Sequence, residues 1–521
     1  MDEKRHQFRA ACSVLALSFL LSVRTATTEA GKLSLKAARK SIAVQELKSH
    51  ITFLASDALE GREAGTIGAW AASKYIIGEL EKVDGLEKGD GGPGDDVKDW
   101  LQYFNGNFRN ILASLPGSDP DLKDEVILIG AHYDHVGYGN RSNSRGPIGF
   151  VHNGADDNAS GTAALIEVLE ALATVDPPPR RSVLAVFWDG EEKGLTGSEH
   201  FVRFPSVPLE QIRLTLNSDM VGRLSSKGLG LHGVRTASGF RQFLVRENTV
   251  GLTLNFSWEY RRDSDHWPFF ERNIPAIMLH TGKHNDYHRP SDDVDKVNYD
   301  GTQQISQFLF QLTMAACNSD ELPKFRLESK PEVSSLKSLE QKYSRIIKRP
   351  SRFGVSYNSG VAERTKRILV TRVEEGSPAR EARLKPDDEI LEMGGHLVTD
   401  VPDFRVLVVT MPSPTMVRFK RNGKEMTVKV ELRGAPVQYG FEWRVDETEP
   451  DSIIVTFVIP GSPADLAGLK RGHRILKFGE DVPGTRDEFR QRLKEVEGEL
   501  RLEVERLGKF SVLKLQKFPP D

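Results

Sequence analysis

The chain has 521 residues, of which 38% are hydrophobic and 28% are charged, as in ordinary globular proteins. This length exceeds what a single hydrophobic core usually serves, so we expect several domains. The 71 Lys and Arg residues are balanced by 74 Asp and Glu residues, which excludes the net positive field that attracts nucleic acid, and we expect no nucleic-acid partner.

Residues 1–30 have the layout of a secretory signal peptide. MDEKRHQFR is positively charged, AACSVLALSFLLSV is a short apolar run, and Ala26 and Ala30 are small residues near a cleavage point. The run is short for a membrane span, and no later stretch of the sequence is apolar enough for one. We expect a periplasmic or secreted protein without a stable membrane span after cleavage. An uncleaved N-terminal anchor is the alternative.

Residues 31–317 are expected to form one α/β domain. Helical patterns at 35–55 and 69–83 are followed by apolar strands at 125–134, 182–192, 214–220 and 276–282, with an apolar helix at 160–175. Short apolar strands alternating with helices predict a mostly parallel sheet that is covered by helices on both faces.

The remainder of the chain reads as a linker and a repeat. Residues 318–348 are polar and charged, which predicts a linker with some helix. Residues 373–395 then align with 458–480 without a gap, at an offset of 85 residues. Each copy carries a strand, a Gly-Ser-Pro-Ala helix start, a helix and a second strand. Two small α+β domains are therefore expected, at 349–434 and 435–518.

Five residues of the kinds that bind zinc occur at separate points of residues 31–317. They are His132, Asp157, Glu192, Asp219 and His288. Two imidazoles and three carboxylates are enough to hold two divalent ions around one shared ligand. Three of the five come at or just past the end of an apolar strand, where sites form in open α/β sheets. The sequence therefore predicts one two-metal centre.

Two further carboxylates accompany these ligands. Glu191 directly precedes Glu192, and neighbouring side chains of an extended segment point apart, so one can bind metal while the other faces water. Asp134 can accept a hydrogen bond from the second nitrogen of His132 and so orient the ring, or it can cap a loop. The other histidines of this region have no such context, with His266 and His284 expected nearest to the cleft; the full set is His135, His152, His200, His266, His280 and His284.

The motifs GAHYD, GADDNASG, GEEKGLTGS, SDM, DSDH and YHRPSDD resemble the zinc metallopeptidase family of aminopeptidase Y and bacterial leucyl aminopeptidases, over about residues 40–318. The resemblance implies a three-layer α/β/α fold of the phosphorylase/hydrolase type and two zinc ions. It implies that His132 and Asp219 hold one zinc and that Glu192 and His288 hold the other. Asp157 would bridge them with its carboxylate, which a cis peptide bond to Asn158 would aim. Asp134 would support the ligands, and Glu191 would be the general base.

The two repeats look like PDZ domains, particularly those attached to bacterial proteases, because of the GSPA, GLKRGHRIL, FGV and YGFE segments. The resemblance implies carboxylate-binding loops and peptide addition to a sheet edge. The loop residues are Phe353, Gly354 and Val355 in the first copy and Tyr439, Gly440 and Phe441 in the second. Arg383 and Asp387 replace the glycines that stand at Gly468 and Gly472, so the loops of the first copy are expected to be strained or rearranged.

Together these features predict an exported dizinc exopeptidase that removes N-terminal residues from peptides, with PDZ domains that recruit peptide or protein partners. The same ligands accept cobalt or manganese. A carboxypeptidase or a glutaminyl-cyclase-like enzyme on the same fold remains open, because metal ligands do not separate these reactions. A non-catalytic PDZ scaffold is the alternative from another class, but no ligand is missing.

Overall fold

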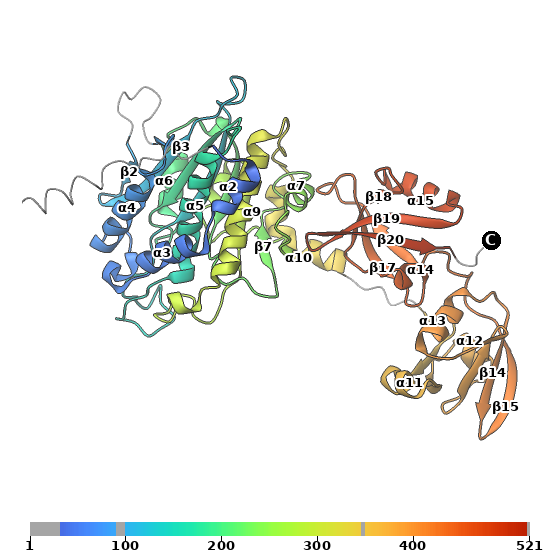
Figure 1. Cartoon of the computed structure of the whole chain (residues 1–521). Helices are drawn as coiled ribbons and strands as arrows, with labels where there is room; N and C mark the ends of the chain where they lie inside the picture. The colour runs from blue at the N-terminus through green and yellow to red at the C-terminus, as the bar shows by residue number, and fades with distance from the viewer. Residues whose placement is uncertain (1–31, 90–98, 345–349, 518–521) are drawn as a thin grey trace, which may run out of the picture.

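The computed structural model describes residues 32–89, 99–344 and 350–517, so the predicted signal peptide lies outside the described residues. Within the described part of the chain, no helix is long and apolar enough to cross a membrane. The chain forms one large domain and two small ones (Figure 1). The second small domain lies between the large domain and the first small one, so the order of the domains in space differs from their order in the sequence.

A nine-stranded mixed sheet forms the framework of the large domain, in the order β1-β3-β5-β4-β6-β9-β7-β8, with β2 paired to β3. The four central strands β5, β4, β6 and β9 are parallel, whereas β3 and β7 join them antiparallel. The prediction of a mostly parallel sheet is therefore wrong at the edges, because buried runs do not reveal strand direction. The strands are β1 (Glu87–Lys88), β2 (Leu101–Phe104), β3 (Phe108–Leu115), β4 (Val126–His132), β5 (Ser182–Trp188), β6 (Ile212–Ser218), β7 (Leu229–His232), β8 (Leu254–Phe256) and β9 (Ala276–His280).

Helices cover both faces of this sheet. Along β4, Ile127 and Ile129 belong to one buried core, whereas Val126 and Leu128 belong to a second core that includes Phe269 of α8. Since successive side chains of a strand point to opposite faces, the two cores lie on opposite sides of the sheet. This confirms the predicted three-layer α/β/α fold. The helices are α2 (Leu35–Ser41), α3 (Val44–Leu54), α4 (Ile67–Leu80), α5 (Gly161–Thr174), α6 (Thr196–Arg203), α7 (Phe240–Arg246), α8 (Trp267–Glu271) and α9 (Tyr299–Asn318).

Local sequence signals start several of these helices. The side chain of Thr66 accepts a hydrogen bond from the backbone N–H of Ala69 at the start of α4, and Asn298 does the same for Gly301 at the start of α9. Helix α5 begins at Gly161 and is buried along most of its length, because it packs against both α9 and the central strands. These caps and apolar faces are encoded locally.

The two small domains repeat one architecture. Their sheets have the orders β10-β11-β12-β14-β15 and β16-β17-β18-β19-β20. In each, a Ser-Pro pair begins a short helix, with Ser377 capping Arg380 and Ser462 capping Asp465. The first contains β10 (Val355–Tyr357), α11 (Ser359–Thr365), β11 (Ile368–Val373), α12 (Pro378–Glu381), β12 (Glu389–Met393), β13 (His396–Leu397), α13 (Val401–Thr410), β14 (Thr415–Arg421) and β15 (Lys424–Val430). The second contains β16 (Phe441–Arg444), β17 (Ile453–Val458), α14 (Pro463–Leu466), β18 (Arg474–Phe478), α15 (Arg486–Glu495), β19 (Glu499–Arg506) and β20 (Lys509–Gln516).

The loops around α12 keep the conformation of the second copy although they lack its glycines. Arg383 and Asp387 have φ values of 60° and 71°, close to the 84° and 89° of Gly468 and Gly472. Side chains are disfavoured in this left-handed region because Cβ approaches the following carbonyl oxygen. The loops are therefore strained rather than rearranged.

Replacing Arg383 or Asp387 by Gly is expected to stabilise the first small domain by about 0.5–1 kcal/mol each, because it removes this backbone strain. Hydrogen exchange of β11 and β12 in the full chain measures the change as a local free energy of opening. Gly468→Ala is the matched control, since an added Cβ meets no atom within 4 Å there and only the backbone cost remains. Gly468→Ala should lower the stability of β17 and β18. If neither Arg383→Gly nor Asp387→Gly changed the free energy of opening, the loops of the first small domain would not be strained.

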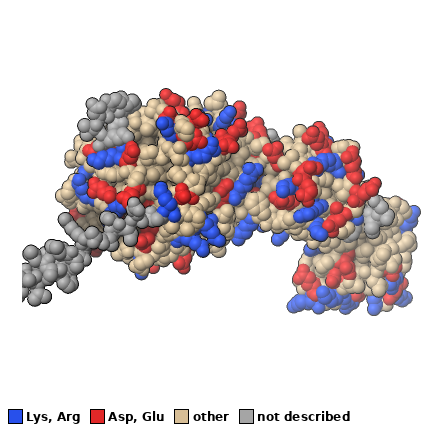
Figure 2. Space-filling view, turned by 45° about the horizontal axis from the view of Figure 1, so that its top comes forward, with Lys and Arg blue, Asp and Glu red and all other residues tan. Residues whose placement is uncertain are grey.

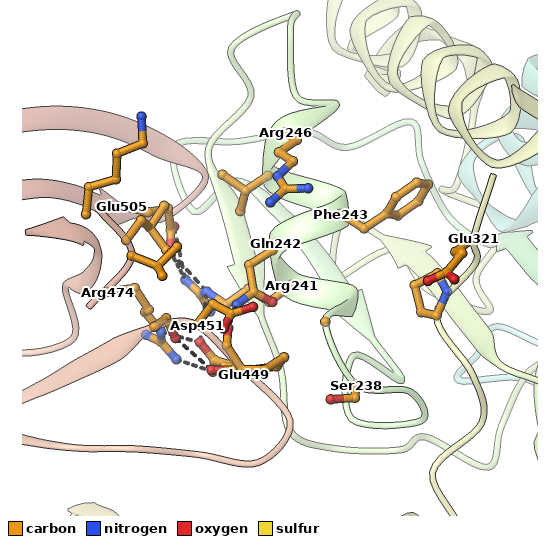
Figure 3. Close-up of a pocket in the computed structure, with 18 of the residues that line it drawn as sticks. Ser238, Arg241, Gln242, Phe243, Arg246, Glu321, Glu449, Asp451, Arg474 and Glu505 are labelled. Carbon is orange, nitrogen blue, oxygen red and sulfur yellow. Dashed lines mark hydrogen bonds and ion pairs between the residues drawn. The ribbon is translucent and has the colours of Figure 1, made fainter. Parts of the chain in front are cut away.

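The second small domain is docked on the large domain through buried charges. The predicted linker contains α10 (Ser329–Ser344), whose Glu332 accepts two hydrogen bonds from Arg235, each 2.9 Å long. Arg235 also contacts Asp446 of the second small domain at 3.2 Å. Beside this network, Arg241 donates hydrogen bonds to Glu505 and Arg474 donates to Glu449, and these four residues line a hollow of about 880 Å³ (Figure 3). The junction is therefore a fixed contact rather than a free hinge.

Candidate metal centre

The predicted ligands converge at one edge of the large sheet, where the central parallel strands end. His132 is the last residue of β4, Glu192 follows β5 and Asp219 directly follows β6. Asp157 lies in a distorted turn (Ala155–Ser160) that leads into α5, and His288 lies in the loop after β9. Since β4, β5, β6 and β9 are neighbours, residues far apart in the sequence line one cleft.

The two oxygens of Asp157 face two different pairs of ligands. Its Oδ1 lies 3.4 Å from His132 Nε2, which is also 3.8 Å from Asp219 Oδ1. Its Oδ2 lies 3.2 Å from His288 Nε2, which is 3.1 Å from Glu192 Oε1. Ligands about 2.0–2.1 Å from one tetrahedral zinc stand about 3.4 Å apart, so each pair with its Asp157 oxygen fits one ion. The residues present therefore fit two ions that share Asp157.

The backbone around Asp157 is held tightly. Gly154 has a φ of 57°, and a Cβ there would come within 2.2 Å of the carbonyl oxygen of Asp157. The carboxylate of buried Asp292 accepts hydrogen bonds from the backbone N–H groups of Asp156 and Asp157, at 3.0 and 3.1 Å. The Asp157–Asn158 peptide bond is cis, which confirms the prediction. These contacts leave both oxygens of Asp157 aimed into the cleft.

Asp134 takes the second of the two roles expected of it, that of a loop cap. Its carboxylate accepts hydrogen bonds from the backbone N–H groups of Glu191 and Glu192, at 3.1 and 3.3 Å. His132 Nδ1 lies 3.7 Å from that carboxylate and instead hydrogen-bonds the Asp134 backbone carbonyl at 3.2 Å. The carboxylate therefore caps the loop that carries the glutamate pair and also lies beside the His132 ring as its ion-pair partner. Asp134 thus places Glu191 and Glu192 together.

Glu191 lines the cleft beside His132 and Asp219. Burial, with the charges of Glu192, Asp265 and Asp219, raises the pKa of Glu191 well above its usual range, although His132 opposes the shift. Burial also acts to raise the pKa of Glu192, but hydrogen bonds from His135 and His288 outweigh it and lower that pKa to about 2. The two neighbouring carboxyls therefore have opposite tendencies, one toward holding a proton and one toward staying ionised.

Several residues of the site were not predicted from the sequence. His135 is buried, and its Nδ1 lies 2.9 Å from Glu192 Oε1, close enough to orient that ligand or to compete for an ion. Tyr287 lines the cleft, and its ring stacks on His288 at 3.9 Å between centroids. Arg261 and Lys283 also line it. The only sequence signal for His135 was its place in the same AHYDH segment as His132.

The expectation for the remaining histidines is wrong in one respect. His280, rather than His266 or His284, lines the cleft. His266 Nε2 hydrogen-bonds the backbone carbonyl of Tyr260 at 3.0 Å, and His284 Nε2 lies 3.1 Å from the carboxylate of Asp156. Both are therefore engaged in supporting contacts around the centre.

The predicted peptide-binding loops occupy equivalent places in the two small domains. Phe353, Tyr439 and Phe441 are buried, so their side chains serve the cores and only their backbone can meet a ligand. Val355 and Phe441 begin β10 and β16, the first strands of their sheets. Gly354 and Gly440 have φ values of 89° and 82°, and a Cβ on either would come within 2.1 Å of the Ser-Pro helix start. Glycine is required at both positions.

Charges of both signs are interspersed over the visible face of the molecule (Figure 2). Lys and Arg alternate with Asp and Glu on the large domain and on both small domains. The even mixture agrees with the near balance of charges in the sequence.

Comparison with known families matches three parts of the chain. Residues 110–313 match the model of peptidase family M28, and residues 344–420 and 454–506 each match a PDZ domain model. Among solved structures, the zinc aminopeptidase BSAP from Bacillus subtilis is similar with 17% identity and a TM-score of 0.42, covering 54% of this chain and 97% of that one.

Curated relatives match the large domain. Aminopeptidase YwaD of Bacillus subtilis is 26% identical over 233 residues, 43% of this chain and 48% of the relative. Leupeptin-inactivating enzyme 1 of Streptomyces exfoliatus is 26% identical over 249 residues, 46% and 50% of the two chains. Leucine aminopeptidase 1 of Trichophyton rubrum is 31% identical over 142 residues, 26% and 35%. The chain thus spans half or less of the length of these relatives. It carries a peptidase family M28 domain followed by two PDZ domains, as the resemblance of its motifs predicts.

Proposed function

We propose that the chain is an exported dizinc aminopeptidase that hydrolyses the N-terminal residue of peptides. One observation carries the proposal: the two carboxylate oxygens of Asp157 face two separate histidine–carboxylate pairs. A carboxylate shared in this way suits a two-metal hydrolase. The names of the relatives, an aminopeptidase and leucine aminopeptidases, support the choice of reaction.

The mechanism follows from which residues hold the ions and which remain free. His132 and Asp219 would hold one zinc, Glu192 and His288 the other, and Asp157 both. When bound, two zinc ions supply Lewis-acid polarisation of the peptide carbonyl and make water acidic enough to attack near neutral pH. Glu191 takes the proton from that water and returns it to the leaving amine. The hydrogen bonds that Asp134 accepts from the backbone of Glu191 and Glu192 would keep Glu191 beside the reacting water and Glu192 directed at its zinc.

A peptide-library digest of the mature protein, with and without a chelator, tests this function. We expect peptides with a free amine to shorten from the N-terminus, N-acetylated peptides to stay intact, and chelation to stop the reaction. Metal analysis should find about two zinc ions per chain. Shortening from the C-terminus would instead identify a carboxypeptidase, and cyclisation of N-terminal glutamine a cyclase. Absence of both metal and turnover would leave a scaffold.

Export is proposed from the charged start and short apolar run at residues 1–30. The protein taken from the periplasm or the medium should have lost about 30 residues, as expected of signal-peptide cleavage. Recovery of the uncut chain from the cytoplasm would contradict export, and recovery of the uncut chain in the membrane would support the anchor.

The PDZ domains are proposed to recruit peptides or proteins through the edges of β10 and β16. The first strands of both sheets lie beside a helix, with Tyr357 packed against Phe404 of α13 and Trp443 against Phe489 of α15. A strand-like peptide can add there through backbone hydrogen bonds. Equal affinity for free and amidated C-termini would argue against carboxylate recognition.

A further inference from the structure

Residues 257–263, here called the bridging loop, connect the second PDZ domain with the candidate metal centre. At one end, the guanidinium carbon of Arg235 lies 4.6 Å from the centroid of the Trp258 ring. That of Arg444, a residue of the second PDZ domain, lies 5.6 Å from the same centroid. At the other end, Arg261 and Asp263 line the cleft that holds the metal ligands. One short segment therefore touches both places.

Tyr260 anchors the loop on the junction. Its hydroxyl donates a 2.7 Å hydrogen bond to Glu332, which also accepts two bonds from Arg235. Arg235 in turn contacts Asp446 of the second PDZ domain. Tyr260 is only 4% exposed, so this charge-assisted bond is shielded from water and strong. The position of Tyr260 thus depends on the docked second PDZ domain and α10.

The next residue, Arg261, is turned toward the cleft by a left-handed backbone, with a φ of 46°. A non-glycine residue holds this conformation only when its surroundings impose it. Arg261 Nε and Nη2 donate to Asp263 at 2.8 and 2.7 Å, and Asp263 also binds Lys283 at 3.2 Å. Within the described residues, Arg261 Nη1 makes no hydrogen bond, so it can donate to a molecule in the cleft.

We propose that the second PDZ domain is a structural part of the catalytic unit and holds the bridging loop so that Arg261 binds an acceptor oxygen of the peptide beside the metal centre. This rests on the proposed peptidase function. Because Tyr260 and Arg261 are adjacent, a shift of one moves the other. Arg261 contacts substrate rather than the reacting water, so its loss weakens substrate binding more than turnover. Tyr260 is a positioning residue that acts through Arg261.

Tyr260→Phe tests the proposal in the full-length zinc-loaded protein. The variant removes only the hydroxyl and keeps the ring packed on Phe270, 5.2 Å between centroids. Loss of one charge-assisted bond should raise the rate of hydrogen exchange across residues 255–265 roughly tenfold. The KM for peptides should also rise roughly tenfold, whereas kcat should stay within about twofold of the wild-type value. Arg261→Met should raise KM by a similar factor, with exchange raised only at residues 261–263, where its pair with Asp263 is lost. Zinc content should stay unchanged in both.

Tyr103→Phe is the control, since Tyr103 is 59% exposed and lies on β2 away from the loop. It should change neither exchange nor KM. Unchanged exchange in Tyr260→Phe would show that the bond of Tyr260 to Glu332 does not hold the loop. Raised exchange with an unchanged KM would show that the loop does not position Arg261 for substrate binding. If the zinc-loaded wild-type protein cleaved no peptide, the proposed function would fail, whereas the exchange measurement would still decide whether the bond of Tyr260 to Glu332, which Arg235 joins to the second PDZ domain, holds the loop.

Discussion

Replacing Glu191 by Gln is expected to lower kcat by roughly a thousandfold while leaving two zinc ions bound. The amide keeps the size of the side chain but cannot accept a proton from the attacking water. The proposed metal ligands are untouched, because Glu191 lies beside them and Asp157, Glu192 and Asp219 would supply the carboxylates. Steady-state kinetics on a free-amine peptide, together with metal analysis of the same preparation, measure both quantities.

Glu210→Gln provides the matched control for this substitution. Glu210 is exposed and precedes β6, at the opposite edge of the sheet from the centre, which follows β6. Its replacement should leave kcat unchanged. Wild-type turnover in Glu191→Gln would remove Glu191 from the mechanism, and loss of zinc would mean that Glu191 is a ligand, as its proximity to His132 and Asp219 also permits.

Replacing Arg241 by Ala is expected to destabilise the docked second PDZ domain by about 3–5 kcal/mol, because it leaves a buried carboxylate without its partner. Arg241 donates bonds of 2.9–3.0 Å to Glu505, whose side chain is 2% exposed, and its guanidinium lies 3.8 Å from the centroid of the Phe256 ring (Figure 3). Hydrogen exchange of β19 and β20 in the full chain measures the local free energy of opening.

Arg490→Ala serves as the exposed counterpart, since Arg490 pairs with Asp487 at 3.0 Å but the two side chains are 48% and 86% exposed. It should cost under about 1 kcal/mol. The double variant Arg241→Ala with Glu505→Ala should recover part of the loss, because no buried charge then lacks a partner. Equal effects of the buried and exposed substitutions would show that the junction does not hold the domain.

The convergence of the candidate ligands was predictable because each residue carries its own local signal. His132 ends β4, and Glu192 and Asp219 come shortly after β5 and β6; the ends of neighbouring parallel strands meet at one edge of a sheet. Gly354 and Gly440 were likewise placed in loops from the sequence, whereas their left-handed backbone was seen only in the structure. The edges of the sheet were not, because the pairing direction of β3 and β7 depends on partners distant in the chain.

The roles of Asp134 and His135 also required the structure. Both follow His132 within three residues, but their partners lie in the loop after β5. Asp134 accepts a hydrogen bond from the backbone of Glu191, and His135 bonds the side chain of Glu192. Asp292 in the YHRPSDD motif supports the backbone of Asp157 from a separate loop. Which of several nearby polar residues touches which partner depends on side-chain directions after packing.

The sequence by itself determined the domain types, the candidate metal ligands and the repeat, because each depends on short segments whose periodicity, glycines and strand ends are encoded locally. Only the tertiary structure decided that Asp157 faces two pairs of candidate ligands and that Arg261 reaches the cleft. It also decided that the second PDZ domain, rather than the first, lies next to the M28 domain. These features depend on contacts such as Arg235 with Asp446 and Arg241 with Glu505, which join segments more than 200 residues apart. Such contacts form only when two segments that fold separately come together, and neither segment shows a sequence pattern that predicts its partner.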